Sequence, residues 1–455
     1  MNKIFSILKG DVAIDLEQDD ISKSILYLSL PIVVINLLRM AYNFADTFWL
    51  SKLSKDALAA VTFSFPVSFL MISVGIGVSI AGSILVAKFK GEKNRIMVDY
   101  TASQTLTFSM LVSFLMGVVA YFNIEKILSI LGASDKVLNI ASGYLRIISI
   151  GIFFIFGFSV FISLMRGFGD TITPMLVMLV SVVLNITLDP FLIFGIGPFP
   201  KMGVEGAAYA TILCRGVAFM IGLLILFSGN KGIQIRAKYL VPDPGFFKKL
   251  VKVGLPSSIE VTAESLSVNA MVAIIGQFST AVVAGYGIGS RIYSFVFLPA
   301  MAASRGISTM TSQNIGARRT DRALKANYLS AKFLFLLLTV LGVFVFFGSE
   351  FLISLFSSDA EVIRTGSQFL RFVAGTFGFV GVWVSFNGGF RGSGKTSVAA
   401  GITILAMAIV RVPVSYFASG YMGVTGIWVG FIVSNLVGGM AAYFLFRKKG
   451  LNYFY

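Results

Sequence analysis

Twelve long apolar runs dominate this chain and leave few folds open to it. About 20 apolar residues in a helix cross the hydrocarbon core of a bilayer. Charged residues make up only 13% of the chain, against about 25% in a typical soluble protein. The sequence therefore predicts an all-α polytopic membrane protein with twelve transmembrane helices. The runs lie at 24–50, 58–88, 100–122, 138–165, 171–194, 203–228, 248–276, 281–311, 326–347, 362–390, 396–417 and 422–446.

The net charge of +16 is explained by the positions of the basic residues, which gather in the connections on one side of the predicted membrane. Basic loops face the cytoplasm. An even number of spans places both termini on that side, so we expect a multi-pass plasma (inner) membrane protein with both termini in the cytoplasm. The same explanation removes the need for a nucleic-acid partner. We expect a monomer surrounded by membrane lipid.

Residues typical of enzyme and metal chemistry are nearly absent from the sequence. The chain has no histidine and a single cysteine, Cys214. This composition excludes a disulfide framework within the chain, a Cys/His zinc site and a histidine-based catalytic triad. We therefore expect neither an enzyme nor a bound cofactor.

The chain contains two copies of one pattern, 225 residues apart. LSLPIVV at 28–34 resembles VGLPSSI at 253–259, and MRGFGDT at 165–171 resembles FRGSGKT at 390–396. Six spans separate the copies, so both copies have the same orientation in the membrane. Such parallel repeats build two pseudo-symmetric lobes of six helices each. The predicted organisation is a cytoplasmic N-terminal segment at 1–23, an N-lobe at 24–228, a cytoplasmic linker at 229–247, a C-lobe at 248–446 and a cytoplasmic tail at 447–455.

The first span carries an acidic residue inside an otherwise apolar run. Arg39, Tyr42, Asn43 and Asp46 follow helical spacing, so they share one face. A carboxylate near the middle of a membrane costs roughly 2.5–3.5 kcal/mol on insertion scales, so it is rarely kept without a use. Pro31 removes one helix hydrogen bond and predicts a bend or hinge in the same span.

The fifth and sixth spans supply more oxygen atoms for this face. Asn185 and Asp189 continue a helical stripe that starts with Met178 and Ser181, and Thr211 lies in the sixth span. Two carboxylates in a poorly solvated site cannot both ionise cheaply, so one binds a proton or the two share a cation. Hard cations prefer oxygen ligands. The predicted site for H⁺ or Na⁺ is Asp46, Asn185, Asp189 and Thr211, supported by Tyr42, Asn43, Met178 and Ser181.

The two copies differ at the acidic positions. Asp46 and Asp189 correspond to Met271 and Val414 in the second copy, which favours a function confined to the first lobe. The seventh span instead carries Glu260 and Glu264. Two interpretations stay open for this pair: a cavity that attracts a cationic substrate, with Glu264 the deeper residue, or a polar face paired with basic loop residues.

Several motifs together resemble the multidrug and toxic compound extrusion (MATE) transporters, especially their prokaryotic DinF-like branch. They are LSLPIVV and MAYNFADTFWL in the first span, the two glycine-containing turns, LNITLDP in the fifth span and GVEGAAYAT in the sixth. The resemblance implies a V-shaped pair of lobes around a central cavity. It also implies export of amphiphilic organic cations in exchange for protons or sodium.

Carried over to this chain, the resemblance makes Asp46 the coupling-ion residue and Tyr42 its neighbour. Asn185, Asp189 and Thr211 complete the cation site, and Pro31 matches the kink of the first helix. The chain departs from other branches of the family because its tenth span has no acidic residue. The alternative function is a flippase for lipid-linked precursors or polysaccharides, which the twelve spans and the acidic first lobe disfavour.

Overall fold

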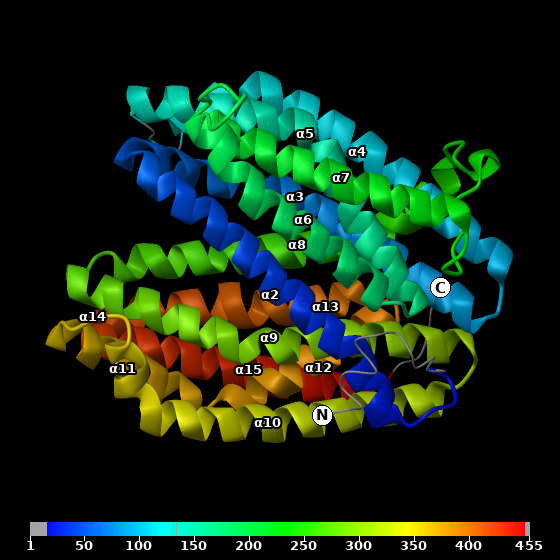
Figure 1. Cartoon of the computed structure of the whole chain (residues 1–455). Helices are drawn as coiled ribbons and strands as arrows, with labels where there is room; N and C mark the ends of the chain where they lie inside the picture. Colours follow the sequence, from blue (N-terminus) through cyan, green and yellow to red (C-terminus); the bar gives the residue numbers. More distant parts are fainter. Residues whose placement is uncertain (1–15, 131, 133, 451–455) are drawn as a thin grey trace. The chain divides into compact units, whose positions relative to one another are not determined.

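The computed structural model describes residues 16–130, 132 and 134–450, and it is helical throughout its long elements (Figure 1). Most of the predicted N-terminal segment at 1–23 and of the tail at 447–455 lies outside these residues. The first half of the chain forms α2 (Ile21–Leu53), α3 (Lys55–Gly91), α4 (Arg95–Ile130), α5 (Asp135–Phe168), α6 (Ile172–Phe194), α7 (Val204–Ser228) and the short η1 (Ala237–Tyr239). The second half forms α8 (Pro244–Ile275), α9 (Thr280–Gly316), α10 (Thr320–Ser354), α11 (Ala360–Ala374), α12 (Phe377–Gly392), α13 (Thr396–Thr403), η2 (Ile404–Arg411), α14 (Val412–Met422) and α15 (Val424–Lys449).

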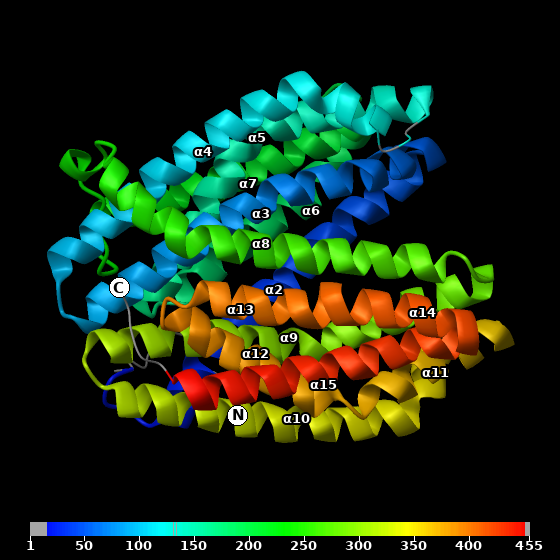
Figure 2. The same ribbon diagram turned by 180° about the vertical axis from the view of Figure 1, so that it is seen from behind.

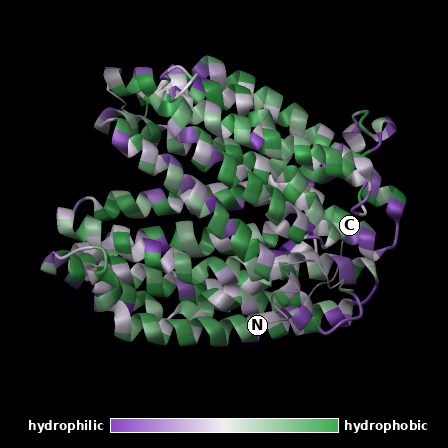
Figure 3. Ribbon diagram, viewed as in Figure 1, coloured by the Kyte–Doolittle hydropathy of each residue, from purple (hydrophilic) through white to green (hydrophobic). Residues whose placement is uncertain are grey.

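The number of membrane spans agrees with the sequence. In the described part of the chain, eleven helices are long and apolar enough to cross a membrane, and α11 with α12 makes a twelfth. These two helices meet at an angle of 57°, so the single run predicted at 362–390 is one broken span. The all-α prediction with twelve spans is confirmed. Figure 3 shows the helices mostly in green and white, with the purple of hydrophilic residues more frequent in the connections between helices.

The chain divides into two compact units. One unit holds Pro31–Ser258, and the other holds the described parts of Ile14–Leu30 and Ile259–Tyr455. In the first unit, α5 packs against α3, α4 and α7, and α6 packs against α7 (Figure 2). In the second unit, α9, α10, α11, α12 and α15 form the packed core, and η2 and α14 lie against α15. Both α2 and α8 pass from one unit to the other, at Pro31 and just after Pro256 respectively.

The two glycine-containing turns are built alike. The second glycine of each turn adopts positive φ, 101° at Gly169 and 77° at Gly394. Its N–H donates to the carbonyl of the arginine three residues earlier, at 2.9 Å in both copies. Positive φ is cheap only for glycine, and such a residue ends a helix by satisfying its last carbonyls.

The first glycine of each turn permits a close contact between helices. A Cβ atom on Gly167 would lie 2.3 Å from the carbonyl oxygen of Ser83, and one on Gly392 would lie 2.4 Å from that of Ser308. Ser83 and Ser308 are themselves 225 residues apart. The repeat seen in the sequence is therefore a repeat of backbone packing.

The segments that precede α2 and α8 are each held by buried polar side chains. Before α8, Asp99 of α4 accepts the Gln234 N–H at 2.9 Å and pairs with Arg236 at 3.3 Å. Before α2, Asn314 of α9 donates to the Leu16 carbonyl at 3.1 Å. These contacts fix the start of the first helix of each lobe.

The eleventh span contains a π-helix, η2, between α13 and α14. A π-helix closes i to i+5 hydrogen bonds, so the residues after it face a different direction from those of an uninterrupted α-helix. After Ile404, a residue of the eleventh span therefore no longer faces the same way as the residue of α6 that lies 225 positions earlier in the sequence. The pairing of Asp189 with Val414 matches their positions in the sequence but not the faces of their helices.

Candidate functional site

The two acidic residues of the first lobe lie together. Asp46 is on α2 and Asp189 is on α6, and their carboxyl groups are within hydrogen-bonding reach of each other. Asn185, one turn before Asp189, donates its side-chain N–H to Asp189 Oδ1 at 2.9 Å and also reaches Asp46. Asn185 and Asp189 are fully buried. The helical stripe of α6 thus meets the polar face of α2, as the spacing predicts.

The cluster is rich in acceptors and poor in donors. Asp46 Oδ1, Asn185 Oδ1 and Asp189 Oδ2 are buried, and no group in the described part of the chain donates a hydrogen bond to them. Buried polar atoms without partners are uncommon in native proteins, and each one needs an explanation. Acceptor oxygens that face each other repel unless a proton or a cation lies between them.

Thr211 of α7 lies beside Tyr42, which is one turn before Asp46 on α2. Its Oγ1 atom is also buried and without a hydrogen-bond partner. The hydroxyl of Tyr42, which is only 2% exposed, donates to the backbone carbonyl of Thr211 at 3.5 Å. Tyr42 therefore joins α2 to α7 at the level of the acidic pair, since it is one turn before Asp46.

The remaining predicted residues have smaller parts in this arrangement. Ser181 donates to the Cys214 carbonyl at 3.3 Å and ties α6 to α7. Met178 is fully buried, and its sulfur accepts from Arg215 Nη1 at 3.3 Å. Asn43 is exposed, and its carbonyl accepts the Thr47 hydroxyl at 2.8 Å. Met178 and Ser181 thus support the cluster, whereas Asn43 is on the open side of α2.

Arg215 of α7 is a neighbour of the cluster that the sequence interpretation left without a role. Its guanidinium carbon lies 4.3 Å from the centre of the Tyr42 ring, and its charge acts on Asp46. A guanidinium over an aromatic face is attracted by the ring. The only signal in the sequence was an arginine inside an apolar span, which does not indicate what it contacts.

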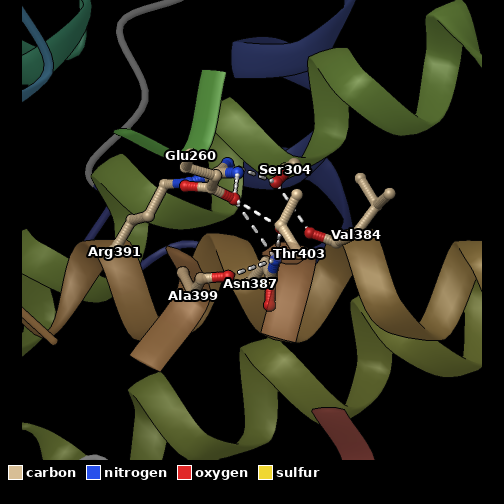
Figure 4. Close-up of polar contacts among 7 residues, drawn as sticks. All are labelled: Glu260, Ser304, Val384, Asn387, Arg391, Ala399 and Thr403. Atoms are coloured by element: carbon tan, nitrogen blue, oxygen red, sulfur yellow. Dashed lines mark hydrogen bonds and ion pairs between the residues drawn. The ribbon is translucent and has the colours of Figure 1, made fainter. Parts of the chain in front are cut away.

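Glu260 forms a buried ion pair inside the second lobe (Figure 4). It is 3% exposed and pairs with Arg391, with Nη2 to Oε1 at 2.6 Å and Nε to Oε2 at 3.1 Å. The Thr403 hydroxyl also donates to Oε1, at 2.8 Å. For Glu260 the paired interpretation is therefore correct, with an arginine at the end of α12 as the partner. Glu264, one turn on, is exposed.

Comparison with known proteins agrees with this architecture. The family model described as MatE matches residues 31–191 and again residues 256–417. The two matched segments begin 225 residues apart, at the spacing of the repeat. The chain belongs to the MATE family. Members of this family are transporters and not enzymes, so this protein is an integral membrane transporter of the multidrug efflux type.

Its relatives are similar over nearly their whole length. The probable multidrug resistance protein YoeA of Bacillus subtilis is 28% identical, over 92% of this chain and 93% of its own. The probable multidrug resistance protein NorM of Thermotoga maritima is 29% identical, over 91% and 90%. A relative from Shewanella oneidensis, named FAD transporter, is 27% identical, over 94% and 95%.

Solved structures have the same fold as this MATE chain. The crystal structure of MATE in the bent conformation superimposes with a TM-score of 0.89 at 25% identity, over 95% of this chain and 96% of the other. A transporter of the MOP superfamily from Pyrococcus furiosus gives 0.88 at 25% identity, over 96% and 98%. That structure is described as having a binding pocket of reverse polarity that suggests a different function.

Proposed function

We propose that this MATE transporter is a secondary antiporter, which exports amphiphilic organic cations in exchange for H⁺ or Na⁺. The coupling ion binds at Asp46, Asn185, Asp189 and Thr211. The observation that carries the proposal is a set of buried oxygen atoms on α2, α6 and α7 to which no group in the described ranges donates a hydrogen bond. A proton or a cation that occupies the site during part of the transport cycle satisfies these oxygen atoms.

The ion drives export through a difference in affinity between two conformations. When the N-lobe site faces the exterior, it takes up a proton or a sodium ion. The bound ion reduces the negative charge of the carboxylates, which otherwise attracts an organic cation. A ligand shifts a conformational equilibrium only as far as its affinity for the two states differs, so ion and substrate must exclude each other. Pro31 is the proposed hinge, because it removes a backbone donor from α2 where that helix passes between the two units.

The surroundings of the transporter are part of this proposal. We place it in the plasma (inner) membrane as a monomer, with both termini in the cytoplasm and with lipid as its only other contact. It works without a cofactor and without nucleic acid. Large apolar side chains on the outer faces, such as Phe122 and Phe347, are 79% and 78% exposed, as suits a surface covered by lipid. They also occupy equivalent positions in the two copies.

Transport in proteoliposomes tests the proposal. We expect ethidium efflux to follow an imposed pH gradient or sodium gradient, and to fall at least tenfold in Asp46→Asn and in Asp189→Asn. Glu125→Gln, an exposed carboxylate of α4 that pairs with Arg146, is the matched control and should transport normally. Unchanged efflux in the two aspartate variants would reject the coupling site. Absence of gradient-dependent efflux in the unmodified protein would instead favour the flippase alternative.

A further inference from the structure

Arg215 is a positive charge in the middle of α7, inside a membrane span of the first lobe. Among the described residues no carboxylate forms an ion pair with it. Its Nη1 atom donates to the sulfur of Met178 at 3.3 Å, and a thioether sulfur is a weak acceptor. An ionised residue in a membrane interior is expensive and marks a functional position. The charge of Arg215 therefore calls for a function of its own.

Three side chains from neighbouring helices enclose this guanidinium group. The guanidinium carbon lies 4.3 Å from the centre of the Tyr42 ring on α2 and 5.7 Å from that of the Phe158 ring on α5. The third side chain is that of Met178 on α6. Met178 is fully buried, and Tyr42 and Phe158 are each 2% exposed. Aromatic faces attract a guanidinium, so Arg215 is held where side chains of four helices meet.

Contacts along α2 and α6 show on which side of the acid pair Arg215 lies. On α6, Met178 contacts Arg215, whereas Asn185 comes seven residues later, about 10 Å along the helix axis. On α2, Tyr42 contacts Arg215, whereas Asp46 comes one turn later. Both helices thus place Arg215 on the side of the acid pair that lies towards the N-terminal end of α2. In the proposed topology this is the cytoplasmic side.

The charge of Arg215 reaches the coupling site without neutralising it. Arg215 acts electrostatically on Asp46, although the two side chains form no ion pair. The other titratable groups that face the acid pair, Tyr144 of α5 and Cys214 of α7, carry no positive charge. A fixed positive charge beside a conduction path excludes protons and other cations. A cation at the acid pair is therefore attracted by the carboxylates and repelled from the side where the guanidinium lies.

We propose that Arg215, together with the buried side chains around it, is an electrostatic barrier that prevents the coupling ion from passing through the first lobe. The inference rests on the proposed coupling site and adds a requirement of antiport to it: an ion that crosses without substrate dissipates the gradient that drives export. The ion held by Asp46 leaves towards the side from which it came unless the lobe changes conformation. Arg215 contacts neither ion nor substrate, and it determines how tightly ion movement is coupled to export.

Ion leak in proteoliposomes without any substrate tests the barrier. Arg215→Gln removes the charge and keeps a polar side chain, whereas Arg215→Lys keeps the charge. A sodium gradient and a pH gradient are imposed in separate experiments, and their decay is followed with radioactive sodium and with an enclosed pH-sensitive dye. We expect at least one gradient to decay fivefold faster or more in Arg215→Gln, and within twofold of the unmodified rate in Arg215→Lys. Arg146→Gln, at an exposed arginine of α5 that pairs with Glu125, is the matched control and should not leak.

Two further variants distinguish a lost barrier from a damaged fold. Leak through the coupling site needs its carboxylates, so Arg215→Gln combined with Asp46→Asn should bring the decay back to within twofold of the unmodified rate. Arg215→Met suits the apolar surroundings and serves as the neutral variant where Arg215→Gln fails to fold. Absence of leak in the folded neutral variant, or leak that persists with Asp46→Asn, would overturn the inference. Failure of the proposed function would appear separately, as absence of gradient-driven efflux in the unmodified protein.

Discussion

Arg391 holds Glu260 through two parallel hydrogen bonds, at 2.6 Å and 3.1 Å, between the end of α12 and the middle of α8. Glu260 has no equivalent in the first lobe, where the corresponding residue is Ile35, whereas Arg391 corresponds to Arg166. Arg166 is buried and donates to Ser163 Oγ at 3.1 Å. The arginine therefore belongs to both copies of the turn, whereas the glutamate that pairs with it occurs at this position in the second copy alone.

Removing one member of the Glu260–Arg391 pair should destabilise the fold far more than replacing both members with apolar residues. Glu260→Gln leaves the Arg391 charge without its partner, and removing one member of a buried pair typically costs about 3 kcal/mol or more. We expect the melting temperature in detergent to fall strongly in Glu260→Gln and in Arg391→Met. The double variant Glu260→Met with Arg391→Met should recover much of the loss, because it buries no charge. A double-variant loss equal to the sum of the single losses would contradict this account.

The close approach at the two repeated turns makes a second prediction. Gly167→Ala and Gly392→Ala each place a methyl group 2.3–2.4 Å from a backbone carbonyl oxygen, which cannot move as a side chain can. Both variants should lower the melting temperature by similar amounts, because the two contacts are equivalent.

Gly401 of α13 is the control for these variants, since a Cβ there would meet nothing within 4 Å. Gly401→Ala should leave stability unchanged or raise it by up to about 1 kcal/mol, the difference in helix propensity. Equal behaviour of Gly401→Ala and Gly392→Ala in thermal unfolding would show that the packing at the turns does not limit stability.

The sequence could predict features that depend on local chemistry or on the repeat. The turns at 165–171 and 390–396 were recognisable because glycine is needed twice in each, and the polar stripe of α6 because helical spacing places Asn185 and Asp189 together. The pairing of Glu260 with Arg391 joins residues 131 positions apart, so no local pattern indicates it. Whether a buried carboxylate has a partner depends on the packing of helices, which hydropathy does not specify.

The break in the tenth span and the environment of Arg411 lay beyond prediction for a related reason. The run at 362–390 carries Arg364 and Arg371 in its first half but contains no proline, so its sequence does not specify the 57° bend where α11 and α12 meet at Gly375 and Thr376. An arginine inside an apolar span is commonly paired in an internal salt bridge or extends its charge toward the membrane surface. Arg411 is instead held by Ser434 and Asn435, which belong to the next helix and are neutral. The amino-acid composition of a span does not indicate such a hydrogen-bond network with the next helix.

Acid should weaken the attachment of the segment before α8 to α4. Asp243 accepts hydrogen bonds from the Tyr100 hydroxyl and from the backbone N–H groups of Phe246 and Gly245. These bonds lower the pKa of Asp243, with Tyr100 the largest cause. A carboxyl whose pKa is lower in the folded state stabilises that state above its unfolded pKa of about 3.9, and the stabilisation is lost as the pH falls further.

Tyr100→Phe removes the donor that lowers the Asp243 pKa most. We expect its melting temperature to be below that of the unmodified protein at pH 7, and the difference to shrink as the pH falls below about 4. Tyr443→Phe on α15, which is exposed, is the control and should show no such dependence. A difference between Tyr100→Phe and the unmodified protein that stays constant from pH 7 to pH 3 would count against a role for the Asp243 charge.

Thr211 offers a way to separate sodium from proton coupling. A proton needs only the carboxylates and their immediate partner, Asn185, whereas a sodium ion needs several oxygen ligands around it. Thr211→Val keeps the shape of the side chain and removes the unpartnered Oγ1 atom. We expect sodium-driven efflux to fall at least tenfold in this variant and proton-driven efflux to stay within twofold. Thr187→Val is the matched control, because Thr187 is an exposed threonine of α6 whose hydroxyl donates to the Val183 carbonyl. Equal loss of both activities in Thr211→Val would mean that the hydroxyl supports the structure of α7 and is not a ligand, because only a ligand's removal discriminates between the two ions.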